Sequence, residues 1–143
     1  MPITYALLLQ SRLVLTIWYG DVSLAQWKDH LSSLLADPDF DSTNLHLVDV
    51  RSATLEPAIK AGEIEGILNF LRPSQARLEG RRVAILSGRE MPTSNLVASI
   101  VTNLGIVIAT FVFSRTALEW LNLEPAEVEP QLQALHRDLP QER

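Results

Sequence analysis

The chain of 143 residues contains no cysteine. Disulfide frameworks, thiolate nucleophiles and cysteine metal sites are therefore excluded, and the composition is that of a protein from a reducing compartment. We expect a cytoplasmic location. Apolar residues make up 47% and charged residues 20% of the chain, which is typical of a folded domain with a real core.

Motifs for catalysis and cofactor binding are also absent. The sequence has no glycine-rich phosphate loop and no G-x-S-x-G nucleophile elbow, and Ser87 has no histidine or lysine near it in sequence. The three histidines, His30, His46 and His136, each lack a second ligand at metal spacing. We therefore expect no cofactor, no metal and no enzymatic activity.

Positive charge is in short supply, because the net charge is −5. Residues 1–70 hold nine acids and four bases, and residues 71–143 hold eight of each. This balance argues against a nucleic-acid partner. The local exception is a group of arginines, which either flank a strand in a solvated loop or form a patch for an anion or an acidic partner. Its members are Arg72, Arg77, Arg81, Arg82 and Arg89.

No uninterrupted apolar run is long enough to predict a membrane span. The nearest is LVASIVTNLGIVIATFVF, Leu96 to Phe113, which polar residues and an Asn-Leu-Gly helix stop interrupt. It is better interpreted as a buried helix, a Gly105 cap and a buried strand. The N-terminus has no basic region before its short apolar run, and we do not expect a signal peptide.

The segments that are present alternate between strand and helix patterns. The order β-β-α-β-α-β-α-β-α predicts an α/β fold: a mixed five-stranded sheet with an N-terminal hairpin and parallel later strands, packed with helices. The expected strands are Ile3–Leu9, Arg12–Tyr19, Leu45–Val50, Arg82–Leu86 and Ile106–Phe113, with Gly20-Asp21 ending the second. The expected helices follow the cap Ser23 up to Asp37, then run over Glu56–Leu71, Pro92–Leu104 and, capped by Ser114, to Leu121.

The tail after residue 123 predicts one more amphipathic helix. Val128, Leu132, Leu135 and Leu139 recur at steps of four, three and four. We divide the chain into a domain over 1–123 and a helical tail over 124–143. The tail packs either on its own domain or on a partner subunit.

Candidate functional residues follow the parallel strands, whose carboxyl ends receive ligands and partners in such sheets. Two exit loops are predicted, Arg51–Leu55 and Ser87–Thr93. Asp49 and Arg51 lie two apart, so their side chains share a face and either pair with each other or cap neighbouring loops. The candidate partner or ligand residues are Asp49, Arg51, Ser52, Thr54, Glu56, Ser87, Gly88 and Arg89.

Four segments, LLADPDF, HLVDVRSAT, GRRVAILS and ALEWLNL, together with the element order, resemble the STAS/SpoIIAA-like group. These are small bacterial domains related to anti-sigma-factor antagonists, and the resemblance covers about residues 3–122. It implies a mixed sheet packed with helices and a regulatory role. The group is also likened to lipid-transfer domains of the CRAL-TRIO type, which implies an apolar ligand as an alternative.

Anti-sigma-factor antagonists carry a phosphorylated Ser or Thr where the third strand meets its helix, in an Asp-Ser-Ser/Thr-Gly-like motif. That core motif is missing here, although Ser52 and Thr54 lie in the corresponding stretch. The resemblance makes both candidate phosphosites. As an alternative, Thr54 is the N-cap of the following helix.

The leading hypothesis is a non-catalytic regulatory domain that binds a protein partner or forms a homodimer. The alternative is a carrier or sensor of a small apolar or acidic ligand. Its cleft would lie near the two exit loops and be lined by Ile59, Phe70 and Leu96.

Overall fold

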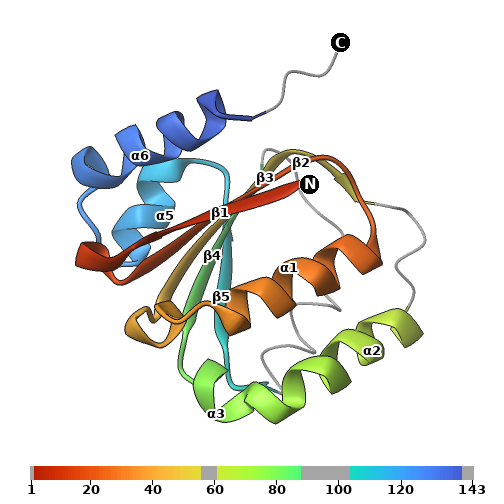
Figure 1. Ribbon diagram of the computed structural model, residues 1–143. Coiled ribbons are helices and arrows are strands. Elements are labelled where there is room, and N and C mark those ends of the chain that lie inside the picture. Colours follow the sequence, from red (N-terminus) through yellow and green to blue (C-terminus); the bar gives the residue numbers. More distant parts are fainter. Residues whose placement is uncertain (1, 56–60, 88–103, 140–143) are drawn as a thin grey trace.

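The computed structural model describes residues 2–55, 61–87 and 104–139, which build one mixed sheet covered by helices (Figure 1). The sheet has five strands in the order β1-β2-β3-β4-β5. The strands are β1 (Ile3–Leu8), β2 (Leu13–Val22), β3 (Leu45–Leu55), β4 (Arg82–Leu86) and β5 (Val107–Phe111). The helices are α1 (Leu24–Ala36), α2 (Ala61–Leu71), α3 (Gln75–Leu78), α5 (Ser114–Trp120) and α6 (Pro125–Arg137), with 3-10 turns η1 (Leu9–Ser11), η2 (Phe40–Ser42) and η3 (Arg72–Ser74).

The strand directions are those that the sequence predicts. β1 is antiparallel to β2, whereas the pairs β2–β3, β3–β4 and β4–β5 are parallel. Figure 1 shows α1, α2 and α3 on one side of the sheet and α5 with α6 on the other. The expected α/β class and the expected mixed five-stranded sheet are confirmed.

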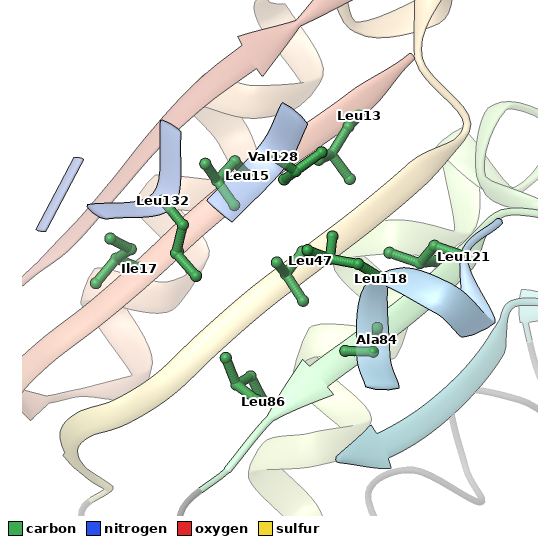
Figure 2. Packing of buried hydrophobic residues seen from close by; sticks show 11 residues of the cluster. Leu13, Leu15, Ile17, Leu47, Ala84, Leu86, Leu118, Leu121, Val128 and Leu132 are labelled. Atoms are coloured by element: carbon green, nitrogen blue, oxygen red, sulfur yellow. The ribbon is translucent and has the colours of Figure 1, made fainter. Parts of the chain in front are cut away.

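The central strand β2 contributes to the core on both faces, because alternate residues of a strand point to opposite sides. Leu13, Leu15 and Ile17 are fully buried beneath α5 and α6, and Val14 is fully buried among residues of α1 and α2. Figure 2 shows Val128 and Leu132 of α6 over the first group. The tail helix thus packs on its own sheet, which was one of the two alternatives.

Local signals place the cap of α1 at Ser23 and a glycine with positive φ before β5, as the sequence predicts. The side chain of Ser23 accepts from the backbone N–H of Gln26, and the Gln26 side chain accepts from the N–H of Ser23. Gly105 has φ +70°, a conformation that favours glycine, between the helical residue Leu104 and β5.

The predicted ends of the second and third strands are wrong. β2 continues through Gly20 to Val22, and β3 continues past Val50 to Leu55. Both extend because they pair with each other: Tyr19 lies opposite Ser52, and Val22 lies opposite Leu55. Gly20, with φ +66°, is accommodated within the strand rather than ending it.

α2 ends at Leu71, as predicted, and the chain then forms η3, which has Pro73 in its first turn, and α3. The start of α5 and the bounds of β5 differ from the prediction. Ser114 is not the cap of α5: Phe113 holds that position, and the Ser114 hydroxyl donates to Glu129 of α6. β5 begins at Val107 and ends at Phe111, inside the predicted bounds.

The predicted helix over Pro92–Leu104 lies outside the described residues except for its last residue. Among the described helices, none is both long enough and apolar enough to cross a membrane. The apolar stretch that follows Gly105 is the edge strand β5.

Candidate functional site

The carboxyl ends of β3, β4 and β5 form one edge of the sheet, which we call the carboxyl edge. It comprises residues 49–55, Ser87 and residues 112–113. The structure brings Asp49, Arg51 and Ser52 together on β3, and it places Ser87 after β4, where its N–H donates to the carbonyl of Phe111. Asp49 and Ser87 thus lie at the carboxyl ends of neighbouring parallel strands, and their role in binding a partner or ligand stays a prediction.

The predicted exit loop Arg51–Leu55 is wrong, because these residues belong to β3. Thr54 pairs with Asp21 in the β2–β3 ladder, so it is a strand residue rather than a helix N-cap. Ser52 is exposed on the same strand. Phosphorylation of Ser52 or Thr54 stays a prediction.

The other predicted residues are only partly within the described chain. Glu56, Gly88 and Arg89 lie outside it, as do Ile59 and Leu96 of the predicted apolar cleft. Phe70 is half-buried against the core that contains Ile67, and the ammonium group of Lys28 lies 5.7 Å from the centre of its ring. Phe70 is thus a packing residue, and the cleft itself stays a prediction.

Asp49 is the centre of a polar cluster at the carboxyl edge. Its side chain is fully buried, and its two oxygens receive Arg51 Nε at 3.0 Å and Arg51 Nη2 at 2.8 Å. The backbone N–H of Arg51 donates to the same carboxylate at 3.0 Å. His136 of α6 places Nε2 2.8 Å from Asp49 Oδ2. The expected pairing of Asp49 with Arg51 is found, and His136 is the member that the sequence did not indicate.

The four contacts explain why the buried Asp49 is ionised and how the β3 bulge beside it is stabilised. Burial alone would raise the pKa of the Asp49 carboxyl, but the hydrogen bonds from Arg51 and His136 outweigh it and lower that pKa below 3.8. The register of β2 and β3 shifts at this point, with Ile17 opposite Asp49 and Tyr19 opposite Ser52. Because the Asp49 side chain satisfies the Arg51 N–H, the extra residue of the bulge leaves no unpaired donor there.

An ionised carboxylate has about four acceptor positions, and Asp49 receives four donors. The cluster therefore joins α6 to the end of β3 and leaves this carboxylate without a free position for a substrate. Within the described residues, no group of three or more acidic or histidine side chains could hold a metal ion.

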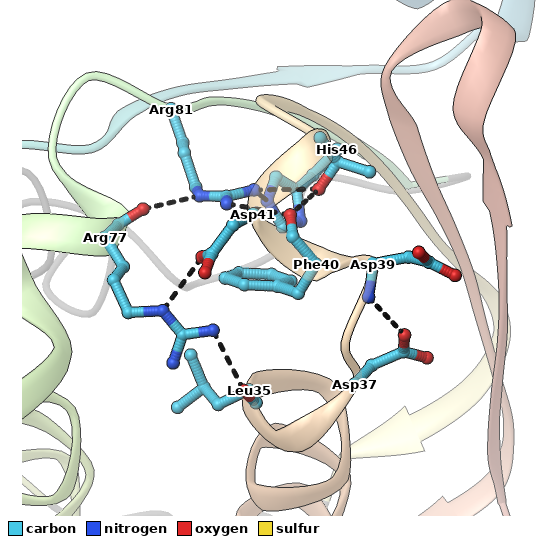
Figure 3. A network of polar contacts seen from close by, with 9 residues as sticks. Leu35, Asp37, Asp39, Phe40, Asp41, His46, Arg77 and Arg81 are labelled. Carbon is cyan, nitrogen blue, oxygen red and sulfur yellow. Dashed lines mark hydrogen bonds and ion pairs between the residues drawn. The ribbon is translucent and has the colours of Figure 1, made fainter.

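In the predicted arginine group, Arg77, Arg81 and Arg82 contact other parts of the fold, Arg72 is exposed, and Arg89 lies outside the described residues. Arg81 is buried, with its guanidinium 3.8 Å from the centre of the Phe40 ring. Figure 3 shows how it joins η2 to the beginning of β3 and to α3: Nη2 donates to the carbonyl of Phe40, and Nε donates to the carbonyl of Arg77. Its Nη1 donates to the hydroxyl of Thr43 at 3.1 Å.

The neighbouring arginines are held by other partners. Arg77 pairs with Asp41 at 2.9 Å and donates to the carbonyl of Leu35. The guanidinium of Arg82 lies 4.2 Å from the centre of the Trp120 ring. Three members of the predicted patch thus bind parts of their own fold.

Two histidines are buried in a neutral state. His46 lies 3.1 Å from Arg81 Nη1 and must accept from it, because an arginine nitrogen has no acceptor. Burial, the charge of Arg81 and His30 together lower the pKa of His46 to about 3. Burial lowers the pKa of His30 to about 4. Both are structural residues next to the Tyr5 and Phe40 rings.

Exposed apolar side chains gather along β5 and just beyond it, which the sequence analysis did not identify. Val107 is 48% exposed, Val112 is 56% exposed and Phe113 is 69% exposed, and Thr110 is exposed between them. We call these four residues the β5 surface. A signal was available: IVIATFVF, residues 106–113, carries no charge, and the last strand of a β-α series lies at a sheet edge.

No protein-family model matches the chain, and no curated protein matches it. Among solved structures, the chain is similar to an uncharacterised protein of the DUF3478 family with a SpoIIAA-like fold from Shewanella loihica PV-4. The two share 18% sequence identity over 76% of this chain and 83% of that chain, with a TM-score of 0.48. The description of that protein names the SpoIIAA-like group, which this sequence also resembles. The likeness concerns the fold, and no function is transferred.

Proposed function

We propose that the chain is a non-catalytic regulatory domain that acts by binding protein, and that the β5 surface is its binding surface. The observation that carries this proposal is the exposure of Val112 and Phe113, at 56% and 69%, directly beyond an edge strand. Large apolar side chains that gather at one edge are a typical sign of an interaction site.

The polar residues at the carboxyl edge support the same proposal. Asp49 is the only acidic residue among the buried polar residues of the described chain, and its acceptor positions are filled by Arg51 and His136. A general acid or base needs a proton position open to its substrate. The cluster of Asp49, Arg51 and His136 instead joins α6 to β3 at the carboxyl edge.

A photo-crosslinking residue in place of Phe113 tests the proposal. We expect a covalent adduct with a polypeptide when the full-length variant is irradiated in its native cells, because the side chain at this position would lie in the interface. The matched control carries the same residue in place of Leu9, which is 45% exposed at the hairpin tip beside β1, the opposite edge of the sheet. Equal labelling at the two positions, or none at position 113, would contradict the proposal.

A further inference from the structure

The outer edge of β5 offers backbone groups for pairing. The N–H of Val107 donates to the carbonyl of Arg81, and the carbonyl of Phe111 accepts from Ser87, so residues 107, 109 and 111 face β4. Because direction alternates along a strand, the N–H and C=O groups of Ile108 and Thr110 face outward. Within the described part of the chain, no backbone group is bonded to them there.

The devices that keep edge strands from pairing are missing in β5. Charged side chains, proline and bulges usually protect such an edge, and β5 has only Val, Ile, Ala, Thr and Phe. The other edge strand, β1, is also uncharged, but none of its side chains is exposed. In β5, by contrast, Val107 and Thr110 are exposed. The two edges therefore differ in the surface that they present to a partner.

The sequence of β5 is complementary to itself in the antiparallel direction. A two-fold axis at Ala109 would place Ile108 opposite Thr110 of a second copy, and their outward groups would form two reciprocal pairs of hydrogen bonds. It would also place Val107 of each copy opposite Phe111 of the other. Val107 and Phe111 point to the face of the sheet that α5 and α6 cover, where Phe111 packs. Ile108 lies between them in the strand and packs in the core on the other face. Pairs of a β-branched and an aromatic residue are favourable across strands.

Charges at the two ends of this pairing are complementary as well. The axis brings the Ser114–Arg115 end of one copy to the Gly105 end of the other. The side chain of Arg115 is 79% exposed and lies 3.7 Å from Glu119 of its own helix, and the exposed Glu79 packs its side chain against Gly105. Each dimer would thus place a cation near an anion at both ends, and the uncharged strand adds no repulsion between two chains of net charge −5.

We infer that the partner of the β5 surface is a second copy of this chain, paired antiparallel through β5 so that two five-stranded sheets join into one of ten strands. The inference rests on the proposed function and names its partner. The interface is isologous, because the same residues of both copies form it and the two-fold axis closes the assembly as a dimer.

Sedimentation velocity of the full chain over a dilution series tests the inference. We expect a species of twice 16.0 kDa at high concentration that converts to 16.0 kDa on dilution. Val107→Lys places a charge opposite Phe111 of the other copy, and Thr110→Pro removes one outward N–H without touching the β4 ladder. Each should weaken the dimer by roughly tenfold or more. Leu9→Lys is the matched control and should behave as the wild type.

Circular dichroism of each variant separates a lost interface from a lost fold. A monomer at all concentrations, or a dimer that neither Val107→Lys nor Thr110→Pro weakens, would overturn the inference. If the chain is monomeric and position 113 still forms an adduct with a different polypeptide, the dimer is rejected and the proposed function stands. If position 113 forms no adduct either, both are rejected.

Discussion

Asp49 shows how a single buried carboxylate is kept ionised by neighbours from two distant parts of the chain. Arg51 lies two residues away, whereas His136 is contributed by α6, 87 residues along the chain. A buried charge that loses its partners is strongly destabilising. The fold therefore depends on this cluster more than on its exposed ion pairs.

The substitution Asp49→Asn should lower the free energy of unfolding by about 2–4 kcal/mol, because Arg51 and His136 lose their anionic acceptor. Urea denaturation followed by circular dichroism measures it. Asp41→Asn is the matched control, since it removes a carboxylate whose side chain is 67% exposed and should cost less than about 1 kcal/mol. Equal costs for the two variants would contradict the structural role of Asp49.

His30 and His46 make the stability dependent on pH. In the folded state the pKa of His30 is about 4 and the pKa of His46 is about 3, both below the ordinary histidine pKa of 6.5. Between pH 6.5 and these values the unfolded chain binds protons that the folded chain does not, so stability falls as the pH falls. Because folding lowers the pKa of the Asp49 carboxyl from 3.8, Asp49 adds to this loss of stability only as the pH falls below about 3.8.

Protonation of each of these two histidines in the unfolded chain should lower the free energy of unfolding by about 2 kcal/mol when the pH falls from ~7.5 to ~5. Urea midpoints across this range measure the slope. His46→Gln keeps an acceptor for Arg81 and removes one titrating group, so the slope should fall by about half. A wild-type stability that stays constant down to pH ~5 would contradict the neutral, buried state of both rings.

Sequence reasoning at the residue scale succeeded for near neighbours and failed for distant ones. The pairing of Asp49 with Arg51 could be predicted, because strand periodicity puts them on one face. The contact of Asp49 with His136, and that of Arg81 with Phe40, join segments 87 and 41 residues apart. Only the packing of α6 and η2 onto the sheet creates them, and periodicity carries no information about that packing.

At the scale of elements, α6 belongs to the core of its own domain. Leu132 is 4% exposed and Val128 is 1% exposed, both in the cluster that includes Leu13 and Leu47. The helix begins with Pro125 at its first position and with Glu124 as its cap, whose side chain accepts from the N–H of Ala126. The buried face of α6 makes this helix a part of the folding unit.

The substitution Leu132→Ala should lower the free energy of unfolding by roughly 2–4 kcal/mol, because it leaves a cavity between α6 and the sheet. Gln133→Ala on the exposed side of the same helix is the control and should change it by less than about 0.5 kcal/mol. Both effects should be independent of protein concentration in urea denaturation. A cost for Leu132→Ala that grows on dilution would show that α6 packs on a partner instead.

Elements with strong local signals were predicted within a residue or two, and those set by distant pairing were not. The capping box of Ser23 and Gln26 defines the start of α1, and the apolar run RVAIL defines β4. The extension of β3 to Leu55 depends on its ladder with Tyr19–Val22 of β2. A polar stretch such as Arg51-Ser52 has no strand signal of its own, so it resembles a loop until its partner strand is known.

At the scale of the whole molecule, β5 forms one edge of the sheet, and no further strand among residues 2–55, 61–87 and 104–139 pairs with its outer side. The α/β class and the parallel arrangement of the later strands follow from the succession of elements. The strand order β1-β2-β3-β4-β5 comes from the structure alone. The binding edge was predicted at the ends of β3 and β4, whereas the exposed apolar residues lie on β5. Exposure is a property of the assembled sheet, which is why an apolar strand in the sequence was expected to be buried.

Amide hydrogen exchange resolved by residue tests this account most directly. In the dimer, the outward N–H groups of Ile108 and Thr110 should be protected at high protein concentration and lose protection on dilution, while that of Ala109, bonded to β4, stays protected. Val107→Lys should shift the appearance of this protection to a protein concentration that is roughly tenfold higher or more, and Leu9→Lys should leave it unchanged. Rapid exchange at Ile108 and Thr110 at every concentration would contradict the claim that two copies of this chain pair through β5.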